Sequence, residues 1–342
     1  MSTPKTRAKG RITLEHVAAQ AGVSPITVSR ALRGERAVAP DLVARVRAAA
    51  DALGYVPDTA ARALASSHSS HVAVLIPLLS NTLFVELVEN VQRTLRPAGF
   101  QTLIGITHYD QKEEEQLLRE QLAHRPAGLL VTGFARSEAT RRLIAASGLP
   151  CVHTMEVSDA PGVYCVGFSQ QDAGQSVTEH LLAGGARRIA FAGAQLDSRV
   201  MQRANGYRHA LQRAGCYDPA LEFLRPDPSS LALGARMLQE IMGKPNAPDA
   251  IFFCIDDLAQ GALLAALRLG ISVPGTVAIA GFNDLPGSDQ MLPTLTSLRT
   301  PRGDIGCRAA TMLLQLMQGR TVLKSCVELP YELIVRGSTA PA

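Results

Sequence analysis

The most constraining feature of this chain is a pair of short helices that the sequence predicts on either side of a glycine-containing turn. Apolar residues recur at helical spacing over Leu14–Ala21, and a glycine then interrupts them. Ser24 is a favourable N-cap, and the proline after it is a favourable first residue, for a second helix over Pro25–Arg33. A third helix is predicted over about Pro40–Leu53. This pattern indicates a helix-turn-helix, whose second helix lies in the major groove of DNA.

The positive charge of the chain is concentrated in the same segment. Residues 1–70 hold ten Lys and Arg against five Asp and Glu, whereas the other 272 residues hold 24 against 25. The net charge of +4 therefore resides entirely in the N-terminal part. A solvated basic tail could have this composition, but a basic segment that also carries capped helices favours contact with DNA phosphates.

Composition and motifs exclude several other classes of protein. The 342 residues, 46% of them hydrophobic, are enough for two or three domains. Neither a signal peptide nor a membrane-spanning stretch is visible, so we expect a cytoplasmic protein without membrane contact. The six cysteines lack metal-binding spacing, and we expect no metal or other cofactor. No nucleophile elbow or phosphate-binding glycine motif is present, so we do not expect an enzyme.

Beyond residue 70 the pattern changes to an α/β alternation. Apolar runs rich in Val, Ile and Leu alternate with amphipathic helices, which indicates parallel sheets covered on both faces. Four predicted strands precede residue 160 and four follow it, so we expect two lobes with a ligand cleft at the carboxyl ends of the strands. The predicted strands are His71–Pro77, Gln101–Ile106, Ala127–Thr132, Pro150–Thr154, Tyr164–Gly167, Arg188–Ala192, Ala250–Phe253 and Val277–Ala280. The predicted helices are Leu83–Leu95, Lys112–His124, Ser137–Ala146, Gln171–Leu182, Val200–Ala214 and Asp257–Leu269.

Residues 13–32 (TLEHVAAQAGVSPITVSRAL) and 53–57 (LGYVP) resemble the signature of the LacI/GalR transcriptional regulators, and the similarity extends to about Arg336. Within that family, residues 81–84, 193–199 and 298–302 resemble the gluconate and 2-ketogluconate repressors. The resemblance implies a homodimer that binds a palindromic operator on double-stranded DNA. It also implies three parts: a helix-turn-helix head (1–57), a hinge helix and linker (58–70), and a body like the periplasmic binding proteins (71–336). The body would comprise lobes at about 71–168 and 169–298 and a returning segment at 299–336.

The resemblance places base-reading side chains at Pro25 and Ile26, with Arg30 one turn later. Arg30 can donate two hydrogen bonds from its guanidinium to the edge of a guanine, and Ile26 can offer apolar contact to a thymine methyl. Alternatively, Ile26 is a buried helix residue and Arg30 forms an ion pair within the head. The expected DNA-contacting residues are Thr13, Ser24, Pro25, Ile26, Thr27, Ser29, Arg30, Ala61 and Leu64.

Residues 58–65 contain good helix formers but span only about two turns, a length that is marginal in water. The resemblance implies that this hinge folds when two copies meet in the minor groove, with Leu64 wedged into a base step. Such a wedge unstacks and bends the duplex at a cost of roughly a few kcal/mol. Without the resemblance, an ordinary linker helix explains the segment equally well.

The resemblance places an effector-gripping arginine at Arg203. Arg199 lies one turn earlier, and an arginine fork suits a carboxylate or vicinal hydroxyls. Asp197 can orient Arg199 or accept from a hydroxyl. Many sugar-binding members carry an aspartate where this chain has the neutral Asn283, so a sugar acid is favoured over a neutral sugar. The expected effector-binding residues are Ser80, Asn81, Phe84, Thr132, Glu156, Asp197, Arg199, Arg203, Asn283 and Arg302.

Several alternatives remain open at this point. Arg199 and Arg302 could each pair with a surface acid, and Phe84 could belong to the core rather than pack on a sugar. The leading hypothesis is a repressor that gluconate or 2-ketogluconate releases from its operator. The alternatives are a regulator of the same family that responds to a neutral sugar or nucleoside, and a sugar-binding protein without a transcriptional role.

Overall fold

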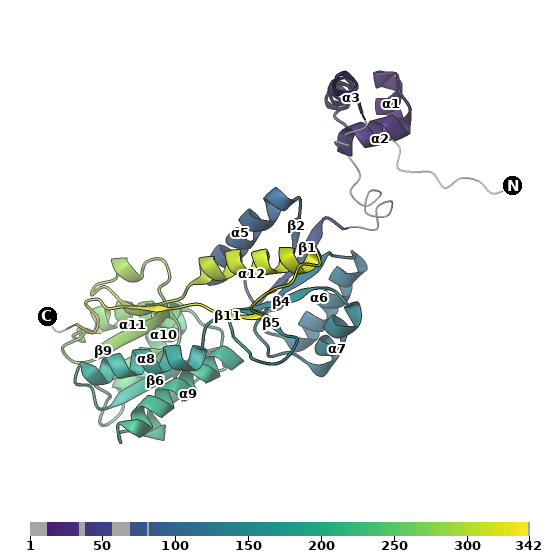
Figure 1. The fold of residues 1–342 in the computed structure, drawn as a ribbon. Coiled ribbons are helices and arrows are strands. Elements are labelled where there is room, and N and C mark those ends of the chain that lie inside the picture. The colour runs from purple at the N-terminus through teal and green to yellow at the C-terminus, as the bar shows by residue number, and fades with distance from the viewer. Residues whose placement is uncertain (1–11, 34–37, 57–68, 81, 341–342) are drawn as a thin grey trace. The chain divides into compact units, whose positions relative to one another are not determined.

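The computed structural model describes residues 12–33, 38–56, 69–80 and 82–340. The chain divides into two compact units, residues 1–69 and 70–342 (Figure 1). In the part of the chain that is described, no helix is long and apolar enough to cross a membrane. The described residues also contain no group of three or more His, Cys, Asp or Glu placed to hold a metal ion.

The described part of the first unit contains three helices, α1 (Leu14–Ala21), α2 (Pro25–Arg33) and α3 (Pro40–Leu53), at the predicted positions. A glycine in the left-handed conformation ends each of α1 and α3. Glycine is favoured at these positions because a residue with a side chain would be strained in that conformation. Apolar residues from all three helices form a small core, in which Val17, Val28 and Val46 are completely buried. The local capping signals therefore predicted these three helices correctly.

The second unit begins with a six-stranded parallel sheet of strand order β11-β5-β4-β3-β1-β2. Successive side chains of β1 point to opposite faces of this sheet. On one face, Val72 and Val74 belong to a buried cluster with helices α5 and α12. On the other face, Ala73 and Leu75 belong to a buried cluster with helix α6. The strands are β1 (His71–Ile76), β2 (Gln101–Ile106), β3 (Gly128–Thr132), β4 (Cys151–Thr154), β5 (Tyr164–Gly167) and β11 (Cys326–Glu328). The helices are α5 (Thr82–Leu95), η1 (Arg96–Ala98), α6 (Gln111–Ala123), α7 (Glu138–Ser147) and α12 (Arg302–Met317).

The second lobe is a similar sheet of strand order β12-β10-β9-β8-β6-β7, in which only β12 runs antiparallel to its neighbour. Its strands are β6 (Ile189–Gly193), β7 (Glu222–Leu224), β8 (Ala250–Phe253), β9 (Ala278–Asn283), β10 (Thr296–Arg299) and β12 (Glu332–Ile334). Its helices are α8 (Gln170–Ala183), α9 (Ser198–Arg213), η2 (Pro219–Leu221), α10 (Leu231–Met242), α11 (Asp256–Leu269) and η3 (Ser288–Gln290). The expected α/β fold with two parallel sheets is confirmed.

Four strands precede residue 160, as predicted, but among the described residues eight strands follow it where four were expected. Strand β5 pairs with β4 in the first sheet and lies within the expected first lobe at about 71–168. Four short strands (β7, β10, β11 and β12) and two helices (α10 and α12) were not predicted. The chain crosses between the lobes three times, after β5, after β10 and after β11, so each lobe is completed by segments from distant parts of the sequence. A local pattern of apolar residues carries no information about such returns.

Candidate functional site

Helix α2 presents an exposed surface at its N-terminal end. The Ser24 hydroxyl caps the helix by accepting from the Thr27 amide at 3.2 Å, and it also hydrogen-bonds the Thr27 hydroxyl at 2.8 Å. Ile26 is 66% exposed, so the alternative that it is a buried helix residue is wrong. Pro25 and Arg30 are exposed as well, whereas Val28 faces the core. An exposed large apolar side chain at the start of this helix is free to contact a partner.

The remaining head residues have more local roles in the structure. The Thr13 amide donates to Nδ1 of His16 at 3.0 Å, so Thr13 caps α1. Ser29 is half-buried on α2. Ala61 and Leu64, which the resemblance assigns to the hinge, lie outside the described residues, as does Asn81.

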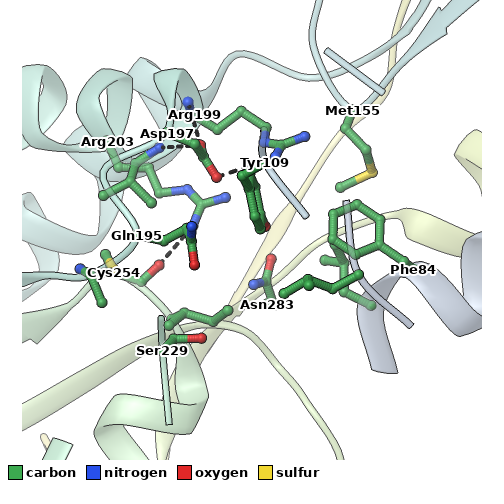
Figure 2. A pocket seen from close by; sticks show the side chains of 15 residues that line it. Phe84, Tyr109, Met155, Gln195, Asp197, Arg199, Arg203, Ser229, Cys254 and Asn283 are labelled. Carbon is green, nitrogen blue, oxygen red and sulfur yellow. Dashed lines mark hydrogen bonds and ion pairs between the residues drawn. The ribbon is translucent and has the colours of Figure 1, made fainter. Parts of the chain in front are cut away.

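A cavity of about 500 Å³, with open solvent included, is lined by residues at or just after the carboxyl ends of strands in both sheets, and Figure 2 shows it from close by. Both lobes contribute to its wall, as the sequence pattern predicts for two α/β lobes. Its charged lining residues are Asp197, Arg199 and Arg203, all on or beside the first turns of α9. Leu78, Leu83, Phe84, Tyr109, Met155, Ala194, Gln195, Val200, Ser229, Cys254, Ile255 and Asn283 complete the lining.

Arg203 is buried and held on three sides. Its Nε donates to Oε1 of Gln170 at 2.8 Å, and its Nη1 donates to the Cys254 carbonyl at 2.7 Å. The guanidinium carbon lies 3.9 Å from the centre of the Phe282 ring. Burial lowers the pKa of Arg203, and within the described residues no carboxylate forms an ion pair with it. Figure 2 shows the guanidinium reaching into the cavity, so its charge faces the space that a ligand would occupy.

Arg199, in contrast, is paired. Its Nη2 lies 3.2 Å from Oδ2 of Asp197, whose other oxygen caps α9 by accepting from the Arg199 and Val200 amides. Burial disfavours the charged form of Arg199, but Asp197, Tyr109 and Glu156 outweigh it and raise the pKa of Arg199. Burial acts against the Asp197 carboxylate too, yet Arg199 and Arg203 hold its pKa below the usual value. Both members of the pair are therefore charged at neutral pH.

Asn283 is 1% exposed, and its side-chain oxygen has no hydrogen-bond partner among the described residues. Its backbone is in the left-handed region at φ 100°, and that of Asp284 is there at φ 49°. Arg302 stabilises this turn by donating to the carbonyls of both residues, and Arg299 and Arg336 bind the Asp284 carboxylate at 2.8 Å each. The turn thus presents an unpaired buried acceptor at the cavity wall, where a ligand hydroxyl would satisfy it.

Two other predicted effector residues line a second part of the cleft, which measures about 860 Å³ with open solvent included. Thr132 and Glu156 line it, and it shares Asp197 and Arg199 with the first cavity. The Thr132 hydroxyl donates to the Leu75 carbonyl. Glu156 accepts from the Phe134 amide at 3.2 Å and from Nε2 of Gln202 at 2.7 Å, which joins the two lobes.

Three predicted residues have other surroundings. The guanidinium of Arg302 forms an ion pair with Glu86 and does not line the cavity, as the alternative reading for this residue foresaw. Ser80 is exposed and is not among the lining residues either. Phe84 is 1% exposed, yet it lines the cavity and lies 5.8 Å from the Arg199 guanidinium. It therefore belongs both to the core and to the wall.

The sequence did not single out Tyr109, Gln195, Ser229 or Cys254, all of which line the cavity. Tyr109, Gln195 and Cys254 each follow the end of a parallel strand by one to three residues, so the strand-end rule could have found them. Burial raises the pKa of Tyr109 to about 12, so its phenol stays protonated and can donate to a ligand. Tyr109 and Gln195 have positive φ values of 61° and 66°, which apolar periodicity does not reveal.

Comparisons with known proteins define the class to which this site belongs. Residues 13–58 match the model of the bacterial regulatory proteins of the lacI family, and residues 178–339 match a periplasmic binding protein-like domain. The chain therefore belongs to the LacI family of transcriptional regulators, and the predictions of a regulator and of a protein that is not an enzyme are confirmed.

Among individual relatives, the chain is similar to the HTH-type transcriptional regulator GntR of Pseudomonas aeruginosa, with 55% identity over 98% of this chain and 97% of the relative. It is 32% identical to GntR of Escherichia coli K12 over 96% of this chain and 99% of the relative. A crystal structure of GntR from Chromobacterium violaceum covers 79% of this chain and 99% of its own, with 49% identity and a TM-score of 0.77. The lac repressor dimer bound to operator covers 97% of this chain and 100% of its own, with 25% identity and a TM-score of 0.86.

Proposed function

We propose that this LacI-family repressor binds a palindromic operator as a homodimer and is released by a sugar acid of the gluconate or 2-ketogluconate type. The observation that carries the choice of effector is the Arg203 guanidinium, which is buried, faces the cavity and has no carboxylate partner among the described residues. A buried charge without a partner is costly, and an anionic ligand would supply the partner.

The charged side chains that line the first cavity support the same choice. Two arginines and one aspartate give the cavity wall one net positive charge, because Arg199 and Asp197 neutralise each other. A ligand with a single carboxylate would balance the remaining charge of Arg203. An aspartate at position 283 would neutralise the charge of Arg203, whereas the uncharged amide of Asn283 leaves that charge unbalanced.

The polar groups around the arginines suit the hydroxyls of a sugar acid. The unpaired oxygen of Asn283 accepts, and the phenol of Tyr109 can donate. Gln195 and Ser229 add groups that can do both. The Phe84 ring provides an apolar surface for the carbon chain. The resemblance to gluconate and 2-ketogluconate repressors points to the same ligand class, and three of the similar proteins described above carry the name GntR.

On the DNA side, the proposal assigns base contacts to Pro25, Ile26 and Arg30 at the exposed start of α2. Thr27 and Ser29 would contact phosphates, with Thr13 and Ser24 holding the helix ends. The hinge residues Ala61 and Leu64 would act in the minor groove. The parts of the chain would then be the head at 1–57, the hinge at 58–70 and the effector-binding body at 71–336.

Effector binding would change how the two lobes close on each other and so weaken operator binding. Couplings of this kind are typically about 1 to 3 kcal/mol, or about 5- to 150-fold in operator affinity. Because the effector would release the repressor from its operator, operator affinity should fall when the effector saturates the protein.

The test is a mobility-shift titration of purified protein on a palindromic operator and on random duplex, with and without gluconate, 2-ketogluconate, glucose or a nucleoside. We expect preference for the palindrome and release by one of the two sugar acids. Release by glucose or the nucleoside alone would replace the sugar acid with the competing effector class. No preference for any symmetric site would overturn the operator assignment.

A further inference from the structure

Gln170, the first residue of α8, lies between the effector cavity and the first lobe. Its Oε1 accepts from Nε of Arg203 at 2.8 Å, and its Nε2 donates to the Met155 carbonyl at 2.9 Å. Arg203 belongs to the second lobe, whereas Met155 directly follows β4 of the first. The Gln170 side chain is completely buried, so water does not compete for either hydrogen bond.

Close packing of α8 against α9 fixes this arrangement. A Cβ at Gly174 would lie 2.5 Å from the Arg203 carbonyl, and a Cβ at Gly206 would lie 2.0 Å from the Gln171 carbonyl. The two helix backbones therefore touch at two glycines, one turn beyond Gln170 and one turn beyond Arg203. As a result, the side chains of Gln170 and Arg203 are held at hydrogen-bonding distance.

The chemistry of the two partners requires a primary amide at position 170. The guanidinium of Arg203 can only donate, and the carbonyl of Met155 can only accept. A side chain between them must accept on one side and donate on the other. Glutamate would satisfy Arg203 but would direct a second acceptor at Met155, and methionine of similar length would satisfy neither.

The Met155 segment is itself firmly attached to the first sheet. The Met155 amide donates to the Val166 carbonyl of β5 at 3.0 Å. A Cβ at Gly167 would lie 2.4 Å from the Glu156 amide nitrogen, so the chain after Met155 packs directly on the end of β5. A displacement of the Met155 carbonyl would therefore move the first lobe with it. Met155 also lines the cavity, so the same segment contacts the ligand space.

We infer that Gln170 is a positioning residue that transmits effector binding at Arg203 to the first lobe through the Met155 carbonyl. The other hydrogen bond of Arg203 leads to the Cys254 carbonyl, which lies within the second lobe. The inference rests on the proposed function, because it takes Arg203 to contact the effector. Beyond the proposed function, the inference names a route from the effector contact at Arg203 to the first lobe, whose strand β1 begins at His71.

The test compares the full-length wild type with Gln170→Met, Gln170→Glu and the control Gln171→Met. The control makes the same change at the neighbouring, exposed position of α8. Calorimetry measures the affinity for gluconate and 2-ketogluconate, and a mobility shift measures operator affinity without effector and at saturating effector. The ratio of these two operator affinities is the coupling, and it is independent of how tightly the effector binds.

We expect the variants at 170 to bind operator like the wild type without effector and to show a coupling reduced by about 2- to 30-fold. Gln171→Met should keep the wild-type coupling. Because Gln170→Glu retains an acceptor for Arg203, it tests transmission even if Gln170→Met does not fold. Wild-type coupling in a folded Gln170 variant at saturation, whatever its effector affinity, would overturn the inference. A wild type that responds to neither sugar acid would instead overturn the effector assignment.

Discussion

Replacing Asn283 with Asp should change the ligand class that the cavity accepts. The substitution keeps the size of the side chain but places a carboxylate at a position of the cavity wall where the native residue, Asn283, is only 1% exposed. Arg203 is the lining arginine that forms no ion pair among the described residues, so we expect the new carboxylate to pair with it and to leave no net charge for a ligand anion. We expect Asn283→Asp to weaken gluconate binding and to leave glucose binding unchanged or improved.

The size of the effect follows from the repulsion between two like charges in one cavity. Arg203 and Asn283 line the same cavity, so we take a separation of roughly 5 to 8 Å between the new carboxylate and a ligand carboxylate bound to Arg203. At an effective dielectric constant of about 20, like charges at that separation repel by about 2 to 3 kcal/mol. Affinity for gluconate should therefore fall by about 30- to 140-fold.

Isothermal calorimetry with gluconate, 2-ketogluconate and glucose measures this change directly. The control variant is Asn246→Asp, which adds the same charge at an exposed position outside the cavity lining. It should bind gluconate like the wild type. Equal gluconate affinity in wild type and Asn283→Asp, with both proteins folded, would show that position 283 does not face an anion. The charge argument for the sugar acid would then be refuted.

Four further predictions concern the cavity, helix α2, position 64 and the core. Arg203→Ala should abolish the response of operator binding to gluconate while operator affinity without effector is retained; an unchanged response removes Arg203 from the site. Arg30→Ala should cost about 1 to 3 kcal/mol and relax preference at one base pair, measured by competition with singly substituted operators; uniform loss on all sequences would contradict a base contact. Leu64→Ala should weaken operator binding far more than binding to random duplex, and equal losses would exclude a wedge. Burial raises the pKa of Asp256 to about 7. Between about pH 4 and 7 the native protein therefore keeps a proton on Asp256 that the unfolded chain has lost. The free energy of unfolding should accordingly decline as pH rises from about 4 through 7. Asp256→Asn should flatten this decline in thermal unfolding measured across that range, and an unchanged slope would assign the pH dependence to other groups.

The head was predictable from sequence because its signals are local. Helix α2 begins where Ser24 can accept from the amide three residues later, and α1 and α3 end where glycines adopt the left-handed conformation. These interactions depend on residues within one turn of each other. The exposure of Ile26 was not predictable in the same way, because it depends on which helix face packs on the rest of the head.

The body was predictable in class but not in connectivity. Strand β1 is a continuous apolar run, and such runs mark strands buried on both faces. Strands β7, β11 and β12 span only three residues each and expose part of their surface, so they have no comparable pattern. They are strands because a neighbouring edge offers hydrogen bonds, which is information about the fold and not about the segment.

The site shows the same division between local and distant causes. The resemblance located Arg203 and Asn283, and the structure places both at the cavity. Sequence reasoning missed Gln170, because its role depends on a helix crossing set by two glycines 32 positions apart, Gly174 and Gly206. Tyr109 was missed for a different reason, since its direction is set by a left-handed backbone beyond the end of β2.

Arg302 shows why a correct neighbourhood does not by itself define a role. The residue follows the crossing after β10, so it lies beside the cleft as the sequence predicts. Its guanidinium is nevertheless occupied by Glu86 and by the carbonyls of Asn283 and Asp284. Because Glu86 belongs to the first lobe and the turn of Asn283 and Asp284 to the second, these contacts of Arg302 join the two lobes. Arg302 does not line the cavity, so in the structure its position is that of a residue between the lobes.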